Sequence, residues 1–198
     1  MTTLVLATRN PGKIKEIHHL LSGSDWQVRS CESYEGCPEP EETGDTFEEN
    51  ALIKARAIAA YTEELTLADD SGLEVDALDG APGVHSARYS GPDATDASNN
   101  ALLLQRLADV PDEQRTARFC CVIAIVAADG RTWTTTGTCE GRIGTSSRGD
   151  AGFGYDPLFT PEGHHQTFGE LGADVKNSIS HRGKAVRAAC ALLDTLDL

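Results

Sequence analysis

The sequence predicts an α/β or α+β fold built on a mixed β-sheet. Strand-like and helix-like segments alternate over the first half of the chain, and two longer strand-like segments joined at Asp129-Gly130 follow. Alternating strands and helices favour parallel strand pairs, whereas a hairpin adds an antiparallel pair. The 198 residues contain no internal repeat, low-complexity tract or long flexible linker. We therefore expect one folded unit, with 39% hydrophobic residues available for its core.

The first strand and helix are expected at the start of the chain. Residues 4–7 form a short apolar run, and Ile14, Ile17 and Leu21 then keep the spacing of three and four that gives a helix one apolar face. This helical pattern stops soon afterwards. A second strand is expected at 26–31.

A loop, a capped helix and a short strand are expected next. Residues 32–44 combine two prolines with several glutamates, which is typical of an exposed loop. Thr46 and Glu49 have the spacing of a capping box, in which each side chain accepts a hydrogen bond from the other residue's backbone N–H. The helix that they begin has its apolar face at 51–59, and a short strand is expected at 65–68.

The second half of the chain is expected to hold a helix, a hairpin and a final helix. The helix is expected at 94–107, and the two strands of the hairpin at 117–128 and 131–140. Ser180 is a candidate N-cap for the final helix. The apolar face of that helix is formed by Val186, Ala189, Cys190 and Leu193.

Composition and charge exclude several classes of partner. Seventeen basic and thirty-one acidic residues give a net charge of −14, which argues against general attraction to nucleic acid or to an anionic membrane. The longest apolar run, 119–128, is too short to span a bilayer as a helix. The first residues lack the basic and apolar regions of a secretory signal. We therefore expect a cytoplasmic protein that binds neither nucleic acid nor membrane.

The six cysteines are expected to be free thiols in the folded interior. They form no CxxC motif and no Cys/His pattern with the spacing of zinc ligands. Cys120 and Cys121 lie inside a predicted strand, where their side chains would point to opposite faces. Buried thiols are favoured over disulfides or metal ligands.

The residues from Thr8 to Lys13, TRNPGK, gather groups that bind anions. Backbone N–H groups at a helix start, the Lys13 ammonium and the side chains of Thr8 and Asn10 can bind phosphate together. A Walker A loop is excluded, because the required upstream glycine is missing and Ile14 follows the lysine. The alternative is a strand-to-helix turn that uses Asn, Pro and Gly only for its geometry.

Asp69 and Asp70 follow the strand expected at 65–68. Successive residues of an extended chain face opposite ways, so one carboxylate can point into a site. The other is expected to accept backbone N–H groups and to stiffen a turn. Mg²⁺ takes one or two carboxylates together with substrate phosphates, and the acidic stretch 39–50 offers further carboxylates. The alternative is an ordinary acidic turn and a solvated acidic surface.

A glycine-rich stretch at 147–157, SRGDAGFGYDP, carries Phe153 and Tyr155. An aromatic ring on such a loop can stack on a nucleotide base, and the alternative is a hairpin tip with one buried aromatic residue. Gly152 and Gly154 do not extend into a GxGxxG motif, which disfavours a dinucleotide-binding fold.

Basic side chains gather around the start of the last expected helix: Lys176, His181, Arg182 and Lys184. Cations gain nothing from the helix dipole at an N-terminus, so their position needs another reason. A polar ligand that supplies hydrogen-bond acceptors is one explanation. Surface salt bridges to the acidic loops are the other.

Phosphate donors, carboxylates of the kind that bind metal, a stacking aromatic residue and basic groups together describe a nucleoside polyphosphate site. Seven motifs between Leu6 and Ala185 carry a family resemblance: LATRNPGK, EETGDTFEENALIKARA, ADDSGLEVDAL, GAPGVHSARYSG, ARFCCVIA, GFGYDPLF and ISHRGKA. In this order they resemble the inosine triphosphate pyrophosphatase family.

The resemblance implies an elongated α/β fold of two lobes with a central mixed β-sheet and the substrate cleft between the lobes. Residues 1–198 would form one such domain, and the protein would be a homodimer. The implied activity is Mg²⁺-dependent hydrolysis of nonstandard purine nucleoside triphosphates, namely ITP, dITP and XTP, to the monophosphate and pyrophosphate. Such an enzyme would cleanse the nucleotide pool.

The resemblance also implies roles for individual residues. The triphosphate would be held by Thr8, Arg9, Asn10, Pro11, Gly12, Lys13 and Lys54. Asp70 would bind Mg²⁺ and act as the general base, with Asp69 as the second catalytic carboxylate beside it. Glu41 or Glu42 would complete the metal site, with Glu42 favoured. Ser71 would contact the substrate, and Phe153 would stack on the base. Base and sugar would be recognised by Phe153, Gly154, Tyr155, Asp156, Lys176, Ser180, His181 and Arg182.

Base selection would depend on hydrogen-bond donors. The 6-oxo group of hypoxanthine or xanthine accepts hydrogen bonds, whereas the 6-amino group of adenine donates them, so Lys, His and Arg donors would be left unpaired against adenine. Two other functions stay open at this point. One is a pyrophosphatase for modified pyrimidine nucleotides, and the other is a nucleotide sensor without catalysis.

Overall fold

The computed structural model describes residues 3–196. The predicted domain covers 1–198, so its residues 1–2 and 197–198 lie outside the described part. The helices are α1 (Pro11–Leu20), α2 (Phe47–Thr62), α3 (Asp96–Arg106), α4 (Ala173–Ile179) and α5 (His181–Leu193). The strands are β1 (Thr3–Leu6), β2 (Gln27–Ser30), β3 (Leu65–Val75), β4 (Thr116–Val126), β5 (Thr132–Ile143) and β6 (Phe159–Pro161).

The strands form one six-stranded sheet in the order β2-β1-β3-β4-β5-β6. β1 pairs in parallel with β2 and β3, whereas β5 pairs antiparallel with β6. The predicted α/β fold with a mixed sheet is therefore confirmed. Leu6 of β1 lies opposite Leu67 of β3, and the Ala7 N–H continues this pairing to the Leu67 carbonyl at 2.8 Å. This register carries the Thr8–Lys13 segment toward the middle of β3.

The chain divides into two compact units. Of the described residues, unit 1 takes 3–70, 121–137 and 182–196, and unit 2 takes 71–120 and 138–181. Strands β3, β4 and β5 each give residues to both units.

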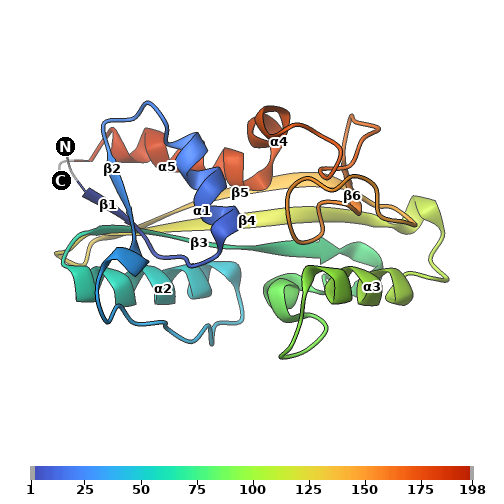
Figure 1. The fold of residues 1–198 in the computed structure, drawn as a ribbon, viewed down its shortest axis with the longest axis horizontal. Helices are drawn as coiled ribbons and strands as arrows, with labels where there is room; N and C mark the ends of the chain where they lie inside the picture. Colours follow the sequence, from blue (N-terminus) through green and yellow to red (C-terminus); the bar gives the residue numbers. More distant parts are fainter. Residues whose placement is uncertain (1–2, 197–198) are drawn as a thin grey trace. The chain divides into compact units, whose positions relative to one another are not determined.

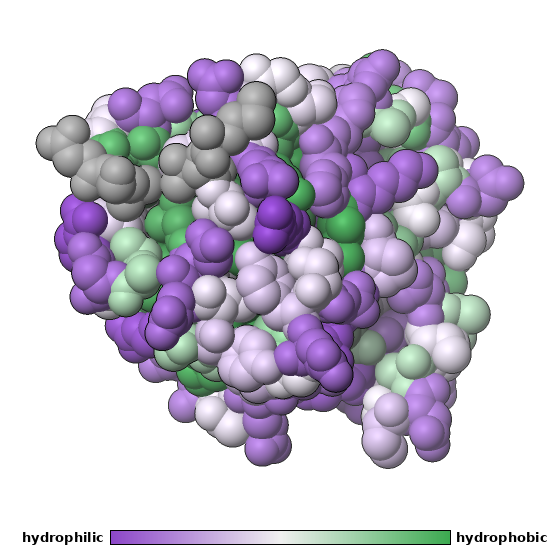
Figure 2. All heavy atoms as spheres, turned by 60° about the vertical axis from the view of Figure 1, so that its left-hand side comes forward, coloured by the Kyte–Doolittle hydropathy of each residue, from purple (hydrophilic) through white to green (hydrophobic). Residues whose placement is uncertain are grey.

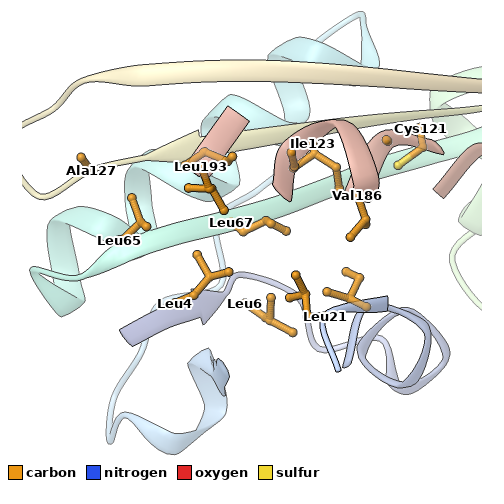
Figure 3. Packing of buried hydrophobic residues seen from close by; sticks show 14 residues of the cluster. Leu4, Leu6, Leu21, Leu65, Leu67, Cys121, Ile123, Ala127, Val186 and Leu193 are labelled. Carbon is orange, nitrogen blue, oxygen red and sulfur yellow. The ribbon is translucent and has the colours of Figure 1, made fainter. Parts of the chain in front are cut away.

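Unit 1 is built around a cluster of aliphatic side chains from β1, β3, β4, α1 and α5. Figure 3 shows members of this cluster gathered together, among them Leu4, Leu67, Ile123 and Val186. α1 and α5 lie on one side of the sheet and α2 on the other (Figure 1). The predicted apolar face of α2 is confirmed, since Ala51, Ala55, Ile58 and Ala59 are buried. The polar residues of this unit that matter for a site lie just after β1, at Thr8–Lys13, and in the middle of β3, at Asp69 and Asp70.

Unit 2 has an aromatic core. Phe119, Phe159 and Phe168 contact one another, with ring centroids 4.7 to 6.0 Å apart. Leu103 and Leu107, from α3 and its end, belong to the same cluster. The loop 144–158, which includes the predicted aromatic loop, contains no helix or strand.

Four elements differ from the sequence-based prediction. α1 begins at Pro11, because Asn10 caps it by accepting a hydrogen bond from the Lys13 N–H, so TRNPGK already contains the first helical turn. β3 runs from Leu65 to Val75 instead of ending before Asp69, so the prediction of a turn at Asp69-Asp70 is wrong. Helix α4 and strand β6 were not predicted.

None of the helices among residues 3–196 combines the length and the apolarity that crossing a bilayer requires. On the face drawn in Figure 2, hydrophilic residues predominate and hydrophobic ones show as small separate patches. All six cysteines are free; Cys31, Cys121 and Cys139 are buried, and the other three are half-buried.

Candidate active site

Asp69 and Asp70 lie next to each other on β3 and contact different groups. Because successive side chains of a strand point to opposite faces, Asp69 contacts Cys121, Lys13 and Arg182, whereas Asp70 contacts Lys54. The predicted opposite orientation of the two carboxylates is confirmed. Each lies in unit 1.

Asp69 is completely buried in a network of side-chain donors. Its carboxylate pairs with the Lys13 ammonium, and its Oδ2 accepts hydrogen bonds from Arg182 Nε at 3.1 Å and Cys121 Sγ at 3.0 Å. The Arg182 guanidinium also pairs with Glu16 of α1. Burial alone would raise the pKa of Asp69, but Arg182 and Lys13 outweigh it and hold this pKa well below its usual range. Asp69 is therefore ionised and ties α1, β3, β4 and α5 together.

The role predicted for the second carboxylate, Asp69, is wrong. The sequence suggested a residue that accepts backbone N–H groups in a turn, but Asp69 lies within a continuous strand and accepts from Cys121 and Arg182 side chains. The physical reason is that the cations from α1 and α5 compensate the cost of burying its charge.

Asp70 is also buried but has a different charge environment. Its Oδ1 lies 2.8 Å from Lys54 Nζ, and the same ammonium lies 2.6 Å from Glu42 Oε1. Burial raises the pKa of Asp70 above its usual value, although Lys54 and Lys13 act in the opposite direction. The two adjacent carboxyl groups thus have pKa values shifted in opposite directions by their different surroundings.

The Thr8–Lys13 segment forms the turn between β1 and α1. The Thr8 hydroxyl oxygen accepts from the Asn10 N–H at 3.2 Å, and Asn10 in turn caps the helix. Lys13, at the third position of α1, reaches back to Asp69. Pro11 and Gly12 fill the first two helical positions. The turn therefore presents an ammonium and the positive end of a helix beside β3.

The acidic loop 32–44 is attached to this turn. Arg9 donates to Glu39 at 3.1 Å and to the Cys37 carbonyl at 2.9 Å. Further along the loop, Glu42 is half-buried against Lys54, whereas Glu41 is exposed. Of the two glutamates that the family resemblance implies as metal ligands, the structure brings Glu42 to Asp70 through their shared lysine.

The carboxylates fit the way in which proteins bind Mg²⁺ with a nucleotide. Among residues 3–196, no three His, Cys, Asp or Glu side chains are grouped closely enough to hold a metal ion by themselves. Glu42 and Asp70 are nonetheless held on either side of one ammonium. Two carboxylates match the one or two that Mg²⁺ takes when phosphates and water supply its other ligands.

In unit 2, Phe153 lies on the glycine-rich loop above a buried ion pair. Lys176 Nζ is 5.0 Å from the Phe153 ring centroid and 2.5 Å from Asp156 Oδ2. The same Asp156 oxygen accepts the Phe153 N–H at 2.9 Å. A side chain at Gly152 would meet this carboxylate at 2.0 Å, so glycine is required there. Lys176 and Asp156 therefore fix the backbone and the ring of Phe153 together.

The remaining predicted recognition residues are placed as follows. Tyr155 is buried, and its hydroxyl donates to the Ser86 carbonyl at 2.9 Å. Ser180 is buried between α4 and α5, and the His181 ring stacks on Phe119 with centroids 4.7 Å apart. Ser71 is half-buried on β3. Among all the predicted recognition residues, the structure brings three together in unit 2: Phe153, Asp156 and Lys176. Arg182 lies with Asp69 in unit 1.

Several residues with partners in these networks were missed from the sequence. Glu16 pairs with Arg182, and Cys121 donates to Asp69. Glu16 stands three residues after Lys13 on α1, so helical spacing could have placed both on one face. Asp96 and Asn100 of α3 bind the backbone of the Phe153 loop, and no spacing signal in the sequence connects them to it.

Comparison with known proteins places the chain in a family. Residues 4–192 match the Ham1 family. The chain is 55% identical over 193 residues to a protein of Desulforamulus reducens named dITP/XTP pyrophosphatase, covering 98% of this chain and 96% of that one. A HAM1 protein structure from Coxiella burnetii aligns with TM-score 0.90 and 41% identity, over 99% of this chain and 100% of that one. The Ham1 protein of Staphylococcus aureus aligns with TM-score 0.87 and 38% identity, over 98% of each chain. These matches confirm the predicted family resemblance, and the chain belongs to the Ham1 family.

Proposed function

We propose that this protein is a pyrophosphatase that hydrolyses nonstandard purine nucleoside triphosphates, namely ITP, dITP and XTP, to the monophosphate and pyrophosphate. The observation that carries the proposal is the pair of adjacent carboxylates on β3, each matched with its own lysine: Asp69 with Lys13, and Asp70 with Lys54. The name of the Desulforamulus reducens relative supports the substrate class.

The phosphate chain would be bound by the cations of unit 1. Lys13 and Lys54 offer ammonium groups, and the N-terminus of α1 adds backbone N–H groups and the positive end of its dipole. Pyrophosphate leaves as negative charge develops on it, so preorganised cations stabilise the transition state more than the ground state. Thr8, Arg9 and Asn10 would contribute from the same turn.

Asp70 would act as the general base. Its pKa is raised by burial, which makes the carboxylate a stronger proton acceptor than an exposed one. It would accept the proton of the water that attacks the α-phosphorus. Asp69 would stay ionised beside it and hold Lys13 toward the phosphates.

We further propose that Glu42 and Asp70 hold Mg²⁺ once a nucleotide is bound. The ion would supply charge neutralisation at the phosphate oxygens. Lys54, which contacts both carboxylates, is placed to move its ammonium from them to the phosphate chain. Glu42 is preferred to Glu41 because Glu41 is exposed and Glu42 reaches the same lysine as Asp70.

The base would be recognised in unit 2. Phe153 offers a ring for stacking, while the Lys176 ammonium lies near that ring and is held by Asp156. Gly154, Tyr155, Ser180 and His181 would complete this part. Arg182 was predicted as a base reader and stays a prediction; in this structure its guanidinium is buried against Asp69 and Glu16.

Four expectations stay predictions. The family resemblance implies that the protein is a homodimer and that it cleanses the nucleotide pool. The sequence predicts that the chain forms one domain and that it works in the cytoplasm. The absence of nucleic-acid and membrane partners, which was inferred from the net charge of −14, also stays a prediction.

The test is a product assay with Mg²⁺ on ITP, dITP and XTP beside ATP, GTP, CTP and UTP. We expect pyrophosphate and the monophosphate from the first three and little turnover of the others. Release of orthophosphate and diphosphate instead would overturn the cleavage position. Preference for modified pyrimidine nucleotides, or binding of dITP without any turnover, would favour the two alternative functions.

A further inference from the structure

Helix α3 binds both backbone polar groups of Gly154 in the Phe153 loop. The Gly154 N–H donates to Asp96 Oδ2 at 2.7 Å, and the Gly154 carbonyl accepts from Asn100 Nδ2 at 3.0 Å. Asp96 and Asn100 are four residues apart, so they lie on the same face of the helix. All three residues belong to unit 2.

The helix that carries these two side chains is itself fixed. Thr95 and Ser98 form a capping box at its start. The neighbouring Asn99 is buried and donates to the Ser86 and Ala87 carbonyls, and Ser86 is also the acceptor of the Tyr155 hydroxyl. α3 is therefore attached to the rest of unit 2 through its cap and through Asn99.

The loop is also held on either side of Gly154, where the Phe153 N–H donates to Asp156 and the Tyr155 hydroxyl donates to the Ser86 carbonyl. Gly152 and Gly154 both have positive φ, +78° and +60°, and glycine restricts the backbone least of all residues. A cavity of about 500 Å³ lies between α3 and the loop, lined in part by Ala97, Ala101 and Pro157. The lining also includes Asp96, Asn100 and Gly154, whose two hydrogen bonds connect the helix to the loop.

The Asn100 amide is oriented so that it donates to Gly154, and this orientation leaves its own oxygen without a hydrogen bond from any of residues 3–196. Its Oδ1 is buried and has no hydrogen-bond partner among the described residues. A buried acceptor without a partner is unfavourable, and turning the amide over would place Oδ1 against the Gly154 carbonyl oxygen. The donated bond to Gly154 is thus the contact that determines the orientation of this side chain.

We propose that Asp96 and Asn100 are positioning residues for base recognition, which act by holding the N–H and the carbonyl of Gly154 and thereby the orientation of the adjacent Phe153 ring. This inference rests on the proposed function. Lys176 and Asp156 hold the peptide on the other side of Phe153, so the ring lies between two fixed points. A loop that is ordered before binding does not lose conformational entropy when the base stacks.

The test compares dITP with ribose 5′-triphosphate, which has the phosphate chain but no base. In Asp96→Ala and in Asn100→Ala, we expect KM for dITP to rise about tenfold, as the loss of one such hydrogen bond implies. kcat should stay within about twofold, because the phosphate-binding residues are unchanged. Hydrolysis of ribose 5′-triphosphate should be unaffected.

A conservative variant separates positioning from general stability. Asp96→Asn keeps an oxygen that accepts the Gly154 N–H, so it should restore KM to near the wild-type value. In ¹H–¹⁵N spectra the Gly154 amide should be displaced in Asp96→Ala and much less in Asp96→Asn. Asp93→Ala and Gln105→Ala are matched controls, since both side chains are exposed in and beside α3, and both should behave as wild type.

Unchanged KM for dITP in Asp96→Ala and Asn100→Ala would overturn the positioning role. An equal loss of activity on dITP and ribose 5′-triphosphate would also overturn it, since it would show general damage. If Asn100→Ala does not fold, the Asp96 variants decide alone. A wild-type chain that releases no pyrophosphate from dITP would remove the proposed function and this inference together, whereas an active wild type with normal variants would remove only the inference.

Discussion

At the scale of the residue, the site depends on how the negative charges of two adjacent carboxylates are compensated by nearby cations. Asp69 faces two cations, from Lys13 and Arg182, and its pKa is held low. Asp70 shares the single ammonium of Lys54 with Glu42, and burial raises its pKa. One strand therefore carries, side by side, a carboxyl group whose pKa is lowered and one whose pKa is raised.

Asp69→Asn should destabilise the protein strongly. The change would leave Lys13 and Arg182 facing a neutral amide in a buried position, and breaking a buried ion pair costs about 3 to 5 kcal/mol. The side chains of Asp69 and Arg182 are only 0% and 3% exposed, so solvent cannot replace the lost charge. Urea unfolding measures the change in the free energy of unfolding.

Asp25→Asn is the control for this experiment. Asp25 is an exposed carboxylate of the same unit, and its replacement should change the free energy of unfolding within about 0.5 kcal/mol. A stability of Asp69→Asn equal to that of the control would show that the buried network contributes nothing.

Residue types were predictable from the sequence, but their partners were not. The strand period placed Asp69 and Asp70 on opposite faces. Nothing local to Arg182 indicated a partner 113 residues away, although its position at a helix N-terminus showed that it needed one. Base recognition was the prediction for Arg182, and the contacts that the structure shows are with Asp69 and Glu16.

At the scale of the element, local signals determine where helices begin. The capping box predicted at Thr46 and Glu49 is present, with the Glu49 N–H 3.1 Å from the Thr46 hydroxyl oxygen. α2 also carries Lys54, so this cap fixes the start of the helix that delivers one of the two lysines to β3.

Thr46→Ala should lower the free energy of unfolding by about 1 kcal/mol, because one N–H at the helix start loses its acceptor. Thr46→Ser keeps the hydroxyl and should recover most of this loss. Chemical denaturation of both variants measures the difference. Equal destabilisation by Ala and Ser would mean that the threonine methyl group, not the cap, is responsible.

Local signals failed where distant groups decide the structure. The letters DDSG are typical of a turn, yet β3 continues through them because Lys13, Lys54 and Arg182 compensate both carboxylates. Asn10 and Pro11 do carry a helix-start signal, an N-cap followed by proline. The helix start was nevertheless predicted later in the chain, because the apolar spacing begins only at Ile14.

At the scale of the whole molecule, the order of elements suggested a mixed sheet, and the motifs indicated the family. The sequence could not give the strand order, because β1 lies between β2 and β3, and only the pairing of segments far apart in the chain decides this. The contact between α3 and Gly154 likewise joins residues 54 and 58 positions apart.

Removal of divalent metal should abolish pyrophosphate release from dITP without changing the unfolding temperature. Glu42 and Asp70 are already paired with Lys54, so the folded state does not need a metal ion to compensate their charges. Activity with EDTA and after addition of Mg²⁺, together with thermal unfolding under both conditions, tests this. Full activity in excess EDTA would contradict the role proposed for Mg²⁺.

Asp70→Asn tests most directly whether Asp70 is the general base while Asp69 holds Lys13. Asn can still accept from Lys54, so we expect normal unfolding and measurable dITP binding, with single-turnover hydrolysis slowed roughly a thousandfold. Asp45→Asn, at an exposed carboxylate of unit 1, should hydrolyse dITP at the wild-type rate. A folded Asp70→Asn protein that hydrolyses dITP at a rate near that of the wild type would contradict the account.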